Sequence, residues 1–344
     1  MLRELELRAP HWGAAPFETL YFGGGTPSLL DARELERLID AVHKLYGVVA
    51  GAEITLEANP DDLTLPKLNE LYDLGINRLS IGIQSFRDED LQTMNRAHNA
   101  QEARNCIRLA REIGFRDLTA DLIYALPGLT DADWVANVDQ LMAMELPHFS
   151  AYSLTVEQKT PLEALIRKGK VAAVPDDTAS RQFDLLMDMA QAHGYEHYEI
   201  SNFAKVGHRA VHNSSYWQNK AYLGIGPSAH SFDGQQRWWN VANNPKYIQS
   251  IASGEFPASY ENIDARTAYN EYVLTALRLK EGIDLQLVLQ RFGEQVEQEL
   301  VQALGDCDPE WYQIEQGHIR LTRKGKHFAD RMASDLFILG DDFV

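Results

Sequence analysis

The chain has 344 residues, of which 45% are hydrophobic and 24% are charged, so it can bury the core of one large domain and a smaller one. Its net charge of -18 repels phosphate backbones and anionic lipid surfaces, which argues against nucleic acid or a membrane surface as a partner. No apolar run approaches the roughly 20 residues of a membrane span, and the first residues are too charged for a signal peptide, so we expect a cytoplasmic protein with no integral membrane segment.

The first segment, MLRELELRAPHWGAAP, has the pattern of a helix end followed by a loop. A closed (β/α) barrel begins with a strand instead. The first βα unit of a barrel is therefore missing from this sequence, and the sheet is expected to be shortened or open at its first edge.

Apolar, β-branched runs then alternate with amphipathic segments. The runs, predicted as strands, are at 18–24, 52–59, 77–84, 117–127 and 148–155. The segments predicted as helices are at about 64–74, 99–113, 131–145 and 179–193, together with one after the glycines of FGGGTP in which Leu35, Leu38, Ile39, Val42 and Leu45 share a face. Asp31 and Glu34 are placed to cap that helix. The alternation predicts an α/β fold, a partial (β/α) barrel.

Polar residues gather where the predicted strands end. They are Gly23, Gly24, Gly25 and Thr26 after the first strand, Glu57 and Asn59, Gln84 and Ser85, Asp121, and Ser153 and Thr155. A buried strand avoids such side chains, because each unpartnered polar group costs on the order of 1–3 kcal/mol. Turn and cap residues would explain any one of these positions, but five strands together favour a ligand site.

The pattern changes after about residue 156. Residues 193–232 are dense in aromatic residues and histidines, and residues 265–344 alternate helices with a hairpin, WYQIEQGHIRLT, whose turn is predicted near Gln316 and Gly317, before a last helix, KGKHFADRMASDLF. We expect three regions: 1–160, the partial barrel; 161–260, a connection packed on it; and 261–344, a small α+β domain of winged-helix type. The acidic composition gives no reason to expect DNA binding by this domain.

The two cysteines are predicted to be structural. Cys106 shares a helix face with Ala103 and Ala110, and Cys307 lies in the acidic segment GDCDPEW, which we interpret as a polar loop.

The glycine stretch has no GK[ST] ending and no GxGxxG spacing, so it is neither kind of phosphate loop. Three glycines at a strand end do allow a ligand to approach bare backbone groups. The pattern therefore favours a ligand recognised through an amino acid or nucleoside portion.

Several motifs follow one another along the chain: FGGGTPSLL, LEANPDDLT, LGINRLSIGIQSF, MNRAH and DLIYALPG. In order and spacing they resemble the radical S-adenosylmethionine (SAM) proteins related to oxygen-independent coproporphyrinogen III oxidase, over essentially the whole chain. HNSSYW at 212–217 resembles the HNxxYW motif of heme chaperones in that family, which the coproporphyrinogen-converting members lack.

The resemblance implies a barrel of the radical-SAM type that, in intact form, binds S-adenosyl-L-methionine on a 4Fe-4S cluster. It implies that Gly24 and Glu57 contact the first SAM molecule, and that Gly25, Thr26, Gln84, Arg96 and Asp121 lie at a second such site. It also implies heme as cargo, with His212 as the candidate heme contact, supported by Asn213, Tyr216 and Trp217, and a haemoprotein as the acceptor.

The spacing of His193, His197, His208 and His212 superficially resembles that of metal ligands. Gly194 interrupts the first pair, and no cysteine accompanies the set. Heme ligation by His212 is better motivated than a zinc site.

One feature of the family is absent. Its cluster is held by CxxxCxxC after the first barrel strand, and neither cysteine of this sequence has a neighbour at such spacing. We expect the motif upstream of Met1 in an intact protein, and no metal ligands in the chain as given.

Three functions remain open: a heme chaperone, a coproporphyrinogen III oxidase of porphyrin biosynthesis, against which HNSSYW argues, and a scaffold that has lost its cofactor.

Overall fold

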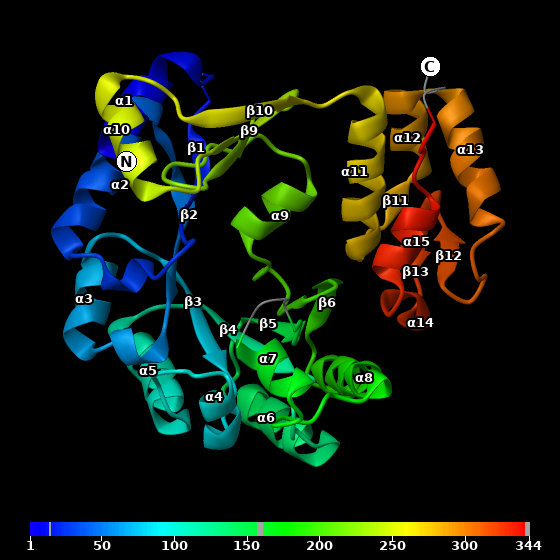
Figure 1. Cartoon of the computed structure of the whole chain (residues 1–344), viewed down its shortest axis with the longest axis horizontal. Helices are drawn as coiled ribbons and strands as arrows, with labels where there is room; N and C mark the ends of the chain where they lie inside the picture. The colour runs from blue at the N-terminus through cyan, green and yellow to red at the C-terminus, as the bar shows by residue number, and fades with distance from the viewer. Residues whose placement is uncertain (14, 157–160, 341–344) are drawn as a thin grey trace.

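The computed structural model describes residues 1–13, 15–156 and 161–340. Its main sheet has seven strands in the order β1-β2-β3-β4-β5-β7-β6. The first five are parallel, and β7 pairs antiparallel with both β5 and β6. The strands are β1 (Phe17–Phe22), β2 (Val48–Ala58), β3 (Arg78–Gln84), β4 (Asp117–Tyr124), β5 (His148–Ser153), β6 (Glu196–Glu199) and β7 (Asn202–Ala204). The sheet curls into a partial barrel with β1 at one edge (Figure 1), as predicted.

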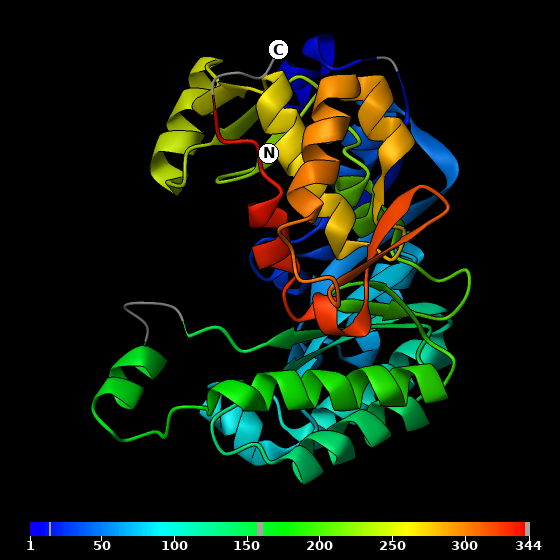
Figure 2. The same cartoon turned by 90° about the vertical axis from the view of Figure 1, so that its right-hand side faces the viewer.

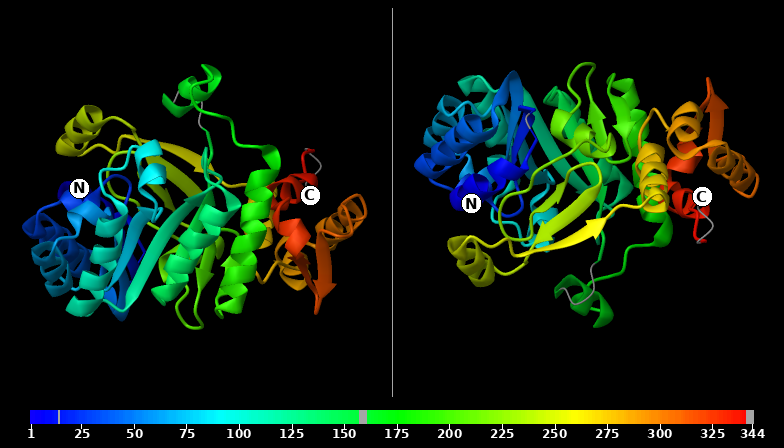
Figure 3. Two further views of the ribbon diagram at one scale, coloured as in Figure 1. Left: turned by 90° about the horizontal axis from the view of Figure 1, so that it is seen from below. Right: turned by 90° about the horizontal axis from the view of Figure 1, so that it is seen from above.

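Helices cover the outer face of this sheet, and Figure 3 shows them wrapped around it from below and above. They are α2 (Ala32–Tyr46), α3 (Leu65–Asp73), α4 (Asp88–Thr93), α5 (Ala100–Ile113), α6 (Asp131–Ala143) and α8 (Asp176–Ala192). Short 3-10 turns, η2 (Pro27–Leu29) and η3 (Pro60–Asp62), follow β1 and β2. A short α7 (Pro161–Arg167) precedes α8. The predicted strands and helices of residues 18–193 are confirmed within a few residues at each end.

Helix α2 differs in detail from its prediction. Leu35, Leu38 and Ile39 are buried as expected, but Leu45 is exposed. Tyr46 takes the inward position of the last turn instead, because its ring packs 5.4 Å from that of Phe17. Asp31 accepts a hydrogen bond from the backbone of Arg33, and no reciprocal bond from Glu34 completes a capping box.

The N-terminal segment forms α1 (Leu2–Arg8) and the 3-10 turn η1 (Ala9–His11), in agreement with the predicted helix end. Glu4 on α1 is fully buried and bonds to Arg8, Asn240, Tyr247 and the backbone N–H of Gly226. A buried carboxylate is stable only with such partners. These hydrogen bonds of Glu4 hold α1 against a second sheet, which is smaller than the main one.

That sheet has the order β10-β9-β8 and is antiparallel. Its strands are β8 (His230–Phe232), β9 (Gln236–Asn240) and β10 (Ala258–Asn262), and two helices accompany it, α9 (Val211–Trp217) and α10 (Asn244–Ser253). Helix α9 packs on β1, inside the curve of the main sheet (Figure 1).

The last part of the chain has its own hydrophobic core and a third sheet in the order β11-β13-β12. Its elements are α11 (Ala265–Arg278), β11 (Ile283–Asp284), α12 (Leu285–Phe292), α13 (Glu294–Leu304), β12 (Tyr312–Glu315), β13 (His318–Leu321), α14 (Arg323–Lys326) and α15 (Ala329–Asp335). This is the predicted winged-helix-like arrangement. The hairpin turn is where it was expected, since Gln316 and Gly317 both have positive φ.

One expectation for this region is wrong. The predicted last helix is divided into α14 and α15, because Phe328 leaves helical geometry to stack on Trp311 at 4.6 Å. Cys307 lies in the loop between α13 and β12, as predicted, but its side chain points into the core and is 6% exposed.

The C-terminal module docks on the rest of the chain beside α8 (Figure 2). The Arg323 guanidinium lies 2.9 Å from the Asp184 carboxylate of α8, and the backbone N–H of Ile200 donates to the carbonyl of Arg278. In the part of the chain that the structure describes, no helix has both the length and the hydropathy of a membrane span.

Candidate functional site

The predicted ligand residues at the strand ends come together around one cavity of about 240 Å³, which we call the strand-end cavity. It lies where β1, β2, β3 and β4 end, as expected for parallel strands. Six of the seven predicted SAM-site residues line it: Gly25, Thr26, Glu57, Gln84, Arg96 and Asp121. The seventh, Gly24, lies beside it and donates its backbone N–H to Glu57 over 3.3 Å.

The hydrogen-bonded side chains of Tyr21 and Glu57 limit the space beside the glycine turn. The Tyr21 hydroxyl donates to Glu57 Oε1 over 2.6 Å. A Cβ on Gly23 would lie 2.6 Å from the Tyr21 ring and 2.8 Å from that carboxylate oxygen, so only glycine fits there. At Gly25 a Cβ would meet nothing within 4 Å. The glycines therefore differ: Gly23 makes room for protein atoms, whereas Gly25 lies at the open cavity.

Arg96 is held at the cavity by two acceptors. Its Nη2 donates to Asn59 Oδ1 over 2.7 Å and to the carbonyl of Gly82 over 3.2 Å. A Cβ on Gly82 would come within 2.9 Å of the Gln84 side chain and 3.2 Å of Arg96. Gln84 itself has a φ of 65°, a conformation that non-glycine residues rarely adopt outside functional or constrained sites.

A second, smaller cavity of about 100 Å³ continues into the curve of the sheet, and we call it the inner cavity. It shares Glu57, Ser80 and Asp121 with the strand-end cavity. Burial raises the pKa of Asp121 to about 6, although hydrogen bonds from serines oppose the shift. This carboxyl group therefore changes its charge near neutral pH.

The sequence analysis missed most of the inner cavity. Its further lining residues include Tyr21, Glu53, Thr55, Arg78, Thr119, Ser150 and Tyr152. They lie inside strands, at every second position of β2, β3, β4 and β5, where side chains on one face of a sheet point the same way. Alternation of polar residues within those strands was the signal that could have revealed them.

Two of the polar strand-end residues, Ser153 and Thr155, are exposed and line neither cavity.

Helix α9 places His212 beside the inner cavity. Its Nδ1 lies 2.7 Å from Thr19 Oγ1, and its Nε2 lies 3.2 Å from the Tyr216 hydroxyl. The imidazole stacks on the Tyr21 ring at 4.6 Å, and burial lowers its pKa to about 4. The ring is therefore neutral at pH 7, with one nitrogen oriented by a hydroxyl, which is how proteins prepare a histidine to ligate a metal.

The four candidate heme residues do not converge on one point. Tyr216 lies with His212, and their rings meet edge-on at 5.1 Å. Asn213 lines the inner cavity, and Trp217 lies under the guanidinium of Arg278 at 5.6 Å. Since a helix turns by about 100° per residue, positions 213 and 217 lie on a different face from 212 and 216.

The four-histidine alternative finds no support in the geometry. His193 bonds to the carbonyl of Met189, His197 stacks on Phe203 at 4.1 Å, and His208 lies 2.9 Å from Asp117. Among the residues that the structure describes, no group of three or more His, Cys, Asp or Glu side chains is arranged to hold a metal ion.

The cysteines do not fit a 4Fe-4S cluster. Cys106 lies in the core of the main domain, as predicted, and Cys307 in the separate core of the C-terminal module. Burial raises the pKa of the Cys106 thiol to about 12, and it also raises that of Cys307. A cluster needs several thiolates side by side, which these two residues cannot supply.

The strand-end cavity does fit the polar parts of SAM. Glu57 and Asp121 are acceptors for an ammonium group or ribose hydroxyls, and the Arg96 guanidinium can pair with a carboxylate. The cavity thus offers both signs of charge that an amino acid portion carries.

Comparison with known proteins agrees with this architecture. The Radical SAM superfamily matches residues 2–141, and the HemN C-terminal domain matches residues 263–328. The solved structure of coproporphyrinogen III oxidase HemN from Escherichia coli, described as a radical SAM enzyme, covers 98% of this chain and 81% of its own, with a TM-score of 0.81. At 22% identity this likeness shows the fold.

Sequence relatives are nearer. The heme chaperone HemW of Bacillus subtilis is 32% identical over 91% of this chain and 84% of its own length. HemW of Mycobacterium tuberculosis is 34% identical over 97% of this chain and 84% of its own length. The chain belongs to the HemW family of the radical SAM superfamily.

Proposed function

We propose that this protein binds heme and delivers it to a haemoprotein in the cytoplasm, with His212 as a heme contact. The relatives named heme chaperones support this, and the observation that carries it is the His212 imidazole. Its Nδ1 is held by Thr19, and its Nε2 lies beside the Tyr216 hydroxyl. A neutral imidazole of this kind can bind heme iron. Tyr216 must then move its hydroxyl away from Nε2.

We further propose that the strand-end cavity binds SAM through Gly24, Gly25, Thr26, Glu57, Gln84, Arg96 and Asp121. Its polar lining and its place at the strand ends support this assignment. We assign no reaction step to an iron–sulfur cluster, because the two cysteines do not fit one. The separate core of the C-terminal module supports the proposed boundary near residue 260. The proposed boundary near residue 160 has no such support, because Phe183 and Phe203 belong to the same core as the strands before it.

Heme titration tests the first proposal. Purified protein and the His212→Ala variant are titrated with hemin while the Soret absorption is followed. We expect the variant to lose one equivalent of bound heme, together with that equivalent's share of the absorption of imidazole-ligated iron. His193→Ala is the matched control, since that histidine is exposed and lies outside both cavities.

An unchanged heme stoichiometry and affinity in His212→Ala would remove this residue from the proposal. Delivery is tested by mixing the heme complex with apomyoglobin, a haemoprotein without its cofactor. Transfer should restore the myoglobin spectrum; a complex that keeps its heme would contradict a chaperone role. Conversion of coproporphyrinogen III, followed by product analysis, would instead support the oxidase.

A further inference from the structure

A third cavity lies outside the main sheet, beside the small sheet β10-β9-β8. It is a groove of about 660 Å³ between α10 and the small sheet, and we call it the α10 groove. Its size is within the roughly 300–1,000 Å³ typical of sites for small organic ligands. None of the motifs that identify the family falls in it.

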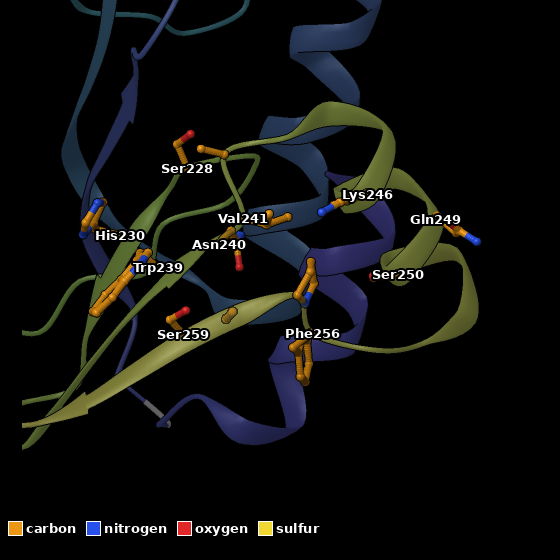
Figure 4. A pocket seen from close by; sticks show the side chains of 13 residues that line it. Ser228, His230, Trp239, Asn240, Val241, Lys246, Gln249, Ser250, Phe256 and Ser259 are labelled. Carbon is orange, nitrogen blue, oxygen red and sulfur yellow. The ribbon is translucent and has the colours of Figure 1, made fainter.

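One wall of the groove is aromatic. His230 on β8 and Ser259 on β10 are the direct cross-strand neighbours of Trp239 on β9, so the three side chains share a face of the sheet. The His230 and Trp239 rings are stacked, with centroids 5.9 Å apart (Figure 4). Phe256 adds a further ring at the other end. Such a wall suits a flat, conjugated ligand.

The opposite wall is polar and carries positive charge. Lys246, Gln249 and Ser250 lie on one face of α10, and Lys246 extends toward the strands (Figure 4). Among the described residues that line the groove, none is Asp or Glu. In a chain with net charge -18 this is a local exception, and it favours an anionic ligand.

His230 also differs from His212 in its freedom. Its side chain is exposed, and no hydrogen bond to its ring nitrogens is found within the described part of the chain. The floor of the groove is fixed, because Asn240 donates to the buried Glu4 over 2.7 Å and to the carbonyl of Gly226 over 2.8 Å. The His230 imidazole therefore has unpaired ring nitrogens among the described residues, and it lies next to Trp239 on a sheet that is held in place by Asn240.

We propose that the α10 groove is a second binding site for a flat, carboxylate-bearing tetrapyrrole, with Trp239 as the stacking surface, Lys246 as the partner of a carboxylate and His230 as the iron contact. An imidazole nitrogen binds iron in the plane of its own ring, so His230 must turn out of its stack on Trp239 to reach the iron. The inference rests on the proposed heme function and extends it, since the protein would hold heme at two separate places. A solvent-exposed binding site of this kind suits a ligand that is later transferred to another protein.

The experiment is a hemin titration of the full chain that counts bound equivalents. We expect two equivalents in the wild type, one in His230→Ala, one in His212→Ala and none in the double variant. His43→Ala, which removes another exposed histidine, should keep both. One equivalent in the wild type that is lost in His212→Ala and unaffected by His230→Ala would overturn the groove and leave the proposed function standing. No bound heme at all in the wild type would overturn both.

A second measurement separates stacking and charge from iron ligation. Iron-free protoporphyrin IX should quench tryptophan fluorescence, and Trp239→Phe should remove most of that quenching. Lys246→Glu should weaken porphyrin binding about tenfold, whereas Lys44→Glu, the same charge change at an exposed site on α2, should leave it unchanged. Equal affinities for the two lysine variants, or tighter binding of ATP than of porphyrin by the same quenching, would show that the ligand class is wrong.

Discussion

The strand-end cavity and the α10 groove are lined by charged residues of different kinds. The first, with the inner cavity behind it, carries Glu53, Glu57 and Asp121, and each of these carboxylates has a hydrogen-bond partner. The groove carries Lys246 and an imidazole with no carboxylate among its described lining residues. The difference suggests two kinds of ligand, one that offers an ammonium group and hydroxyls and one that offers carboxylates.

The two regions also hold their histidines differently. His212 has a hydroxyl at each ring nitrogen and a tyrosine ring against its face. The His230 ring stacks on that of Trp239, and no hydrogen bond to its nitrogens is found among the residues that the structure describes. Oriented imidazoles bind iron with less loss of freedom, whereas free ones accept and release a ligand with less rearrangement. A protein that receives and passes on heme would benefit from both.

The largest expected effect concerns iron and sulfide. We expect the 344-residue chain, reconstituted under anaerobic conditions, to retain no 4Fe-4S cluster, because its two thiols lie in different cores with raised pKa values. Desalting followed by iron and sulfide analysis and absorption near 400 nm checks this. A stable brown protein with stoichiometric iron would contradict it. If no cluster is retained, a ligand in the strand-end cavity is held by the polar side chains of the chain alone.

Burial of Asp121 at the strand-end cavity predicts a pH effect. Asp121 has a folded-state pKa of about 6 against 3.8 as its ordinary value, so the fold favours its neutral form, and this stability is lost as the pH rises through 6. Asp121→Asn should remove that cost. Its free energy of unfolding in urea, relative to the wild type, should rise by about 2.4 kcal/mol between pH 4 and pH 8.

Asp139→Asn provides the matched control, because this carboxylate is exposed on α6 and has no such burial. Its effect should be the same at both pH values. A constant difference for Asp121→Asn as well would mean that the carboxyl group is not kept neutral by its surroundings.

The glycine turn gives the smallest of the three effects. Gly23→Ala forces a methyl group into the Tyr21–Glu57 pair and should lower the free energy of unfolding by about 2 kcal/mol, the usual range for overpacking. Gly25→Ala should cost less than 1 kcal/mol, since a Cβ there meets nothing within 4 Å. Urea denaturation of both variants measures this. Equal losses would show that the turn, rather than the pair beside it, requires glycine at position 23.

The sequence by itself determined the outline of this protein. Periodicity located the five parallel strands and the longer helices of residues 18–193, since the two periods of 2 and 3.6 are local properties. The short helices α4 and α7 were not predicted. The hairpin at Gln316 and Gly317 was also predicted, because a two-residue turn with positive φ leaves a local signature. The motifs gave the family and six residues that line one cavity.

Only the tertiary structure decided how those residues are used. Tyr21 and Glu53 gave no signal at a strand end, because their importance comes from facing the inside of a curled sheet. Trp217 was grouped with His212 because both belong to HNSSYW, yet its ring lies on another face of α9, under the guanidinium of Arg278. Cys307 is buried because the module closes over it. The α10 groove joins residues 228 to 259 across a helix and three strands, so its lining exists only in the folded chain.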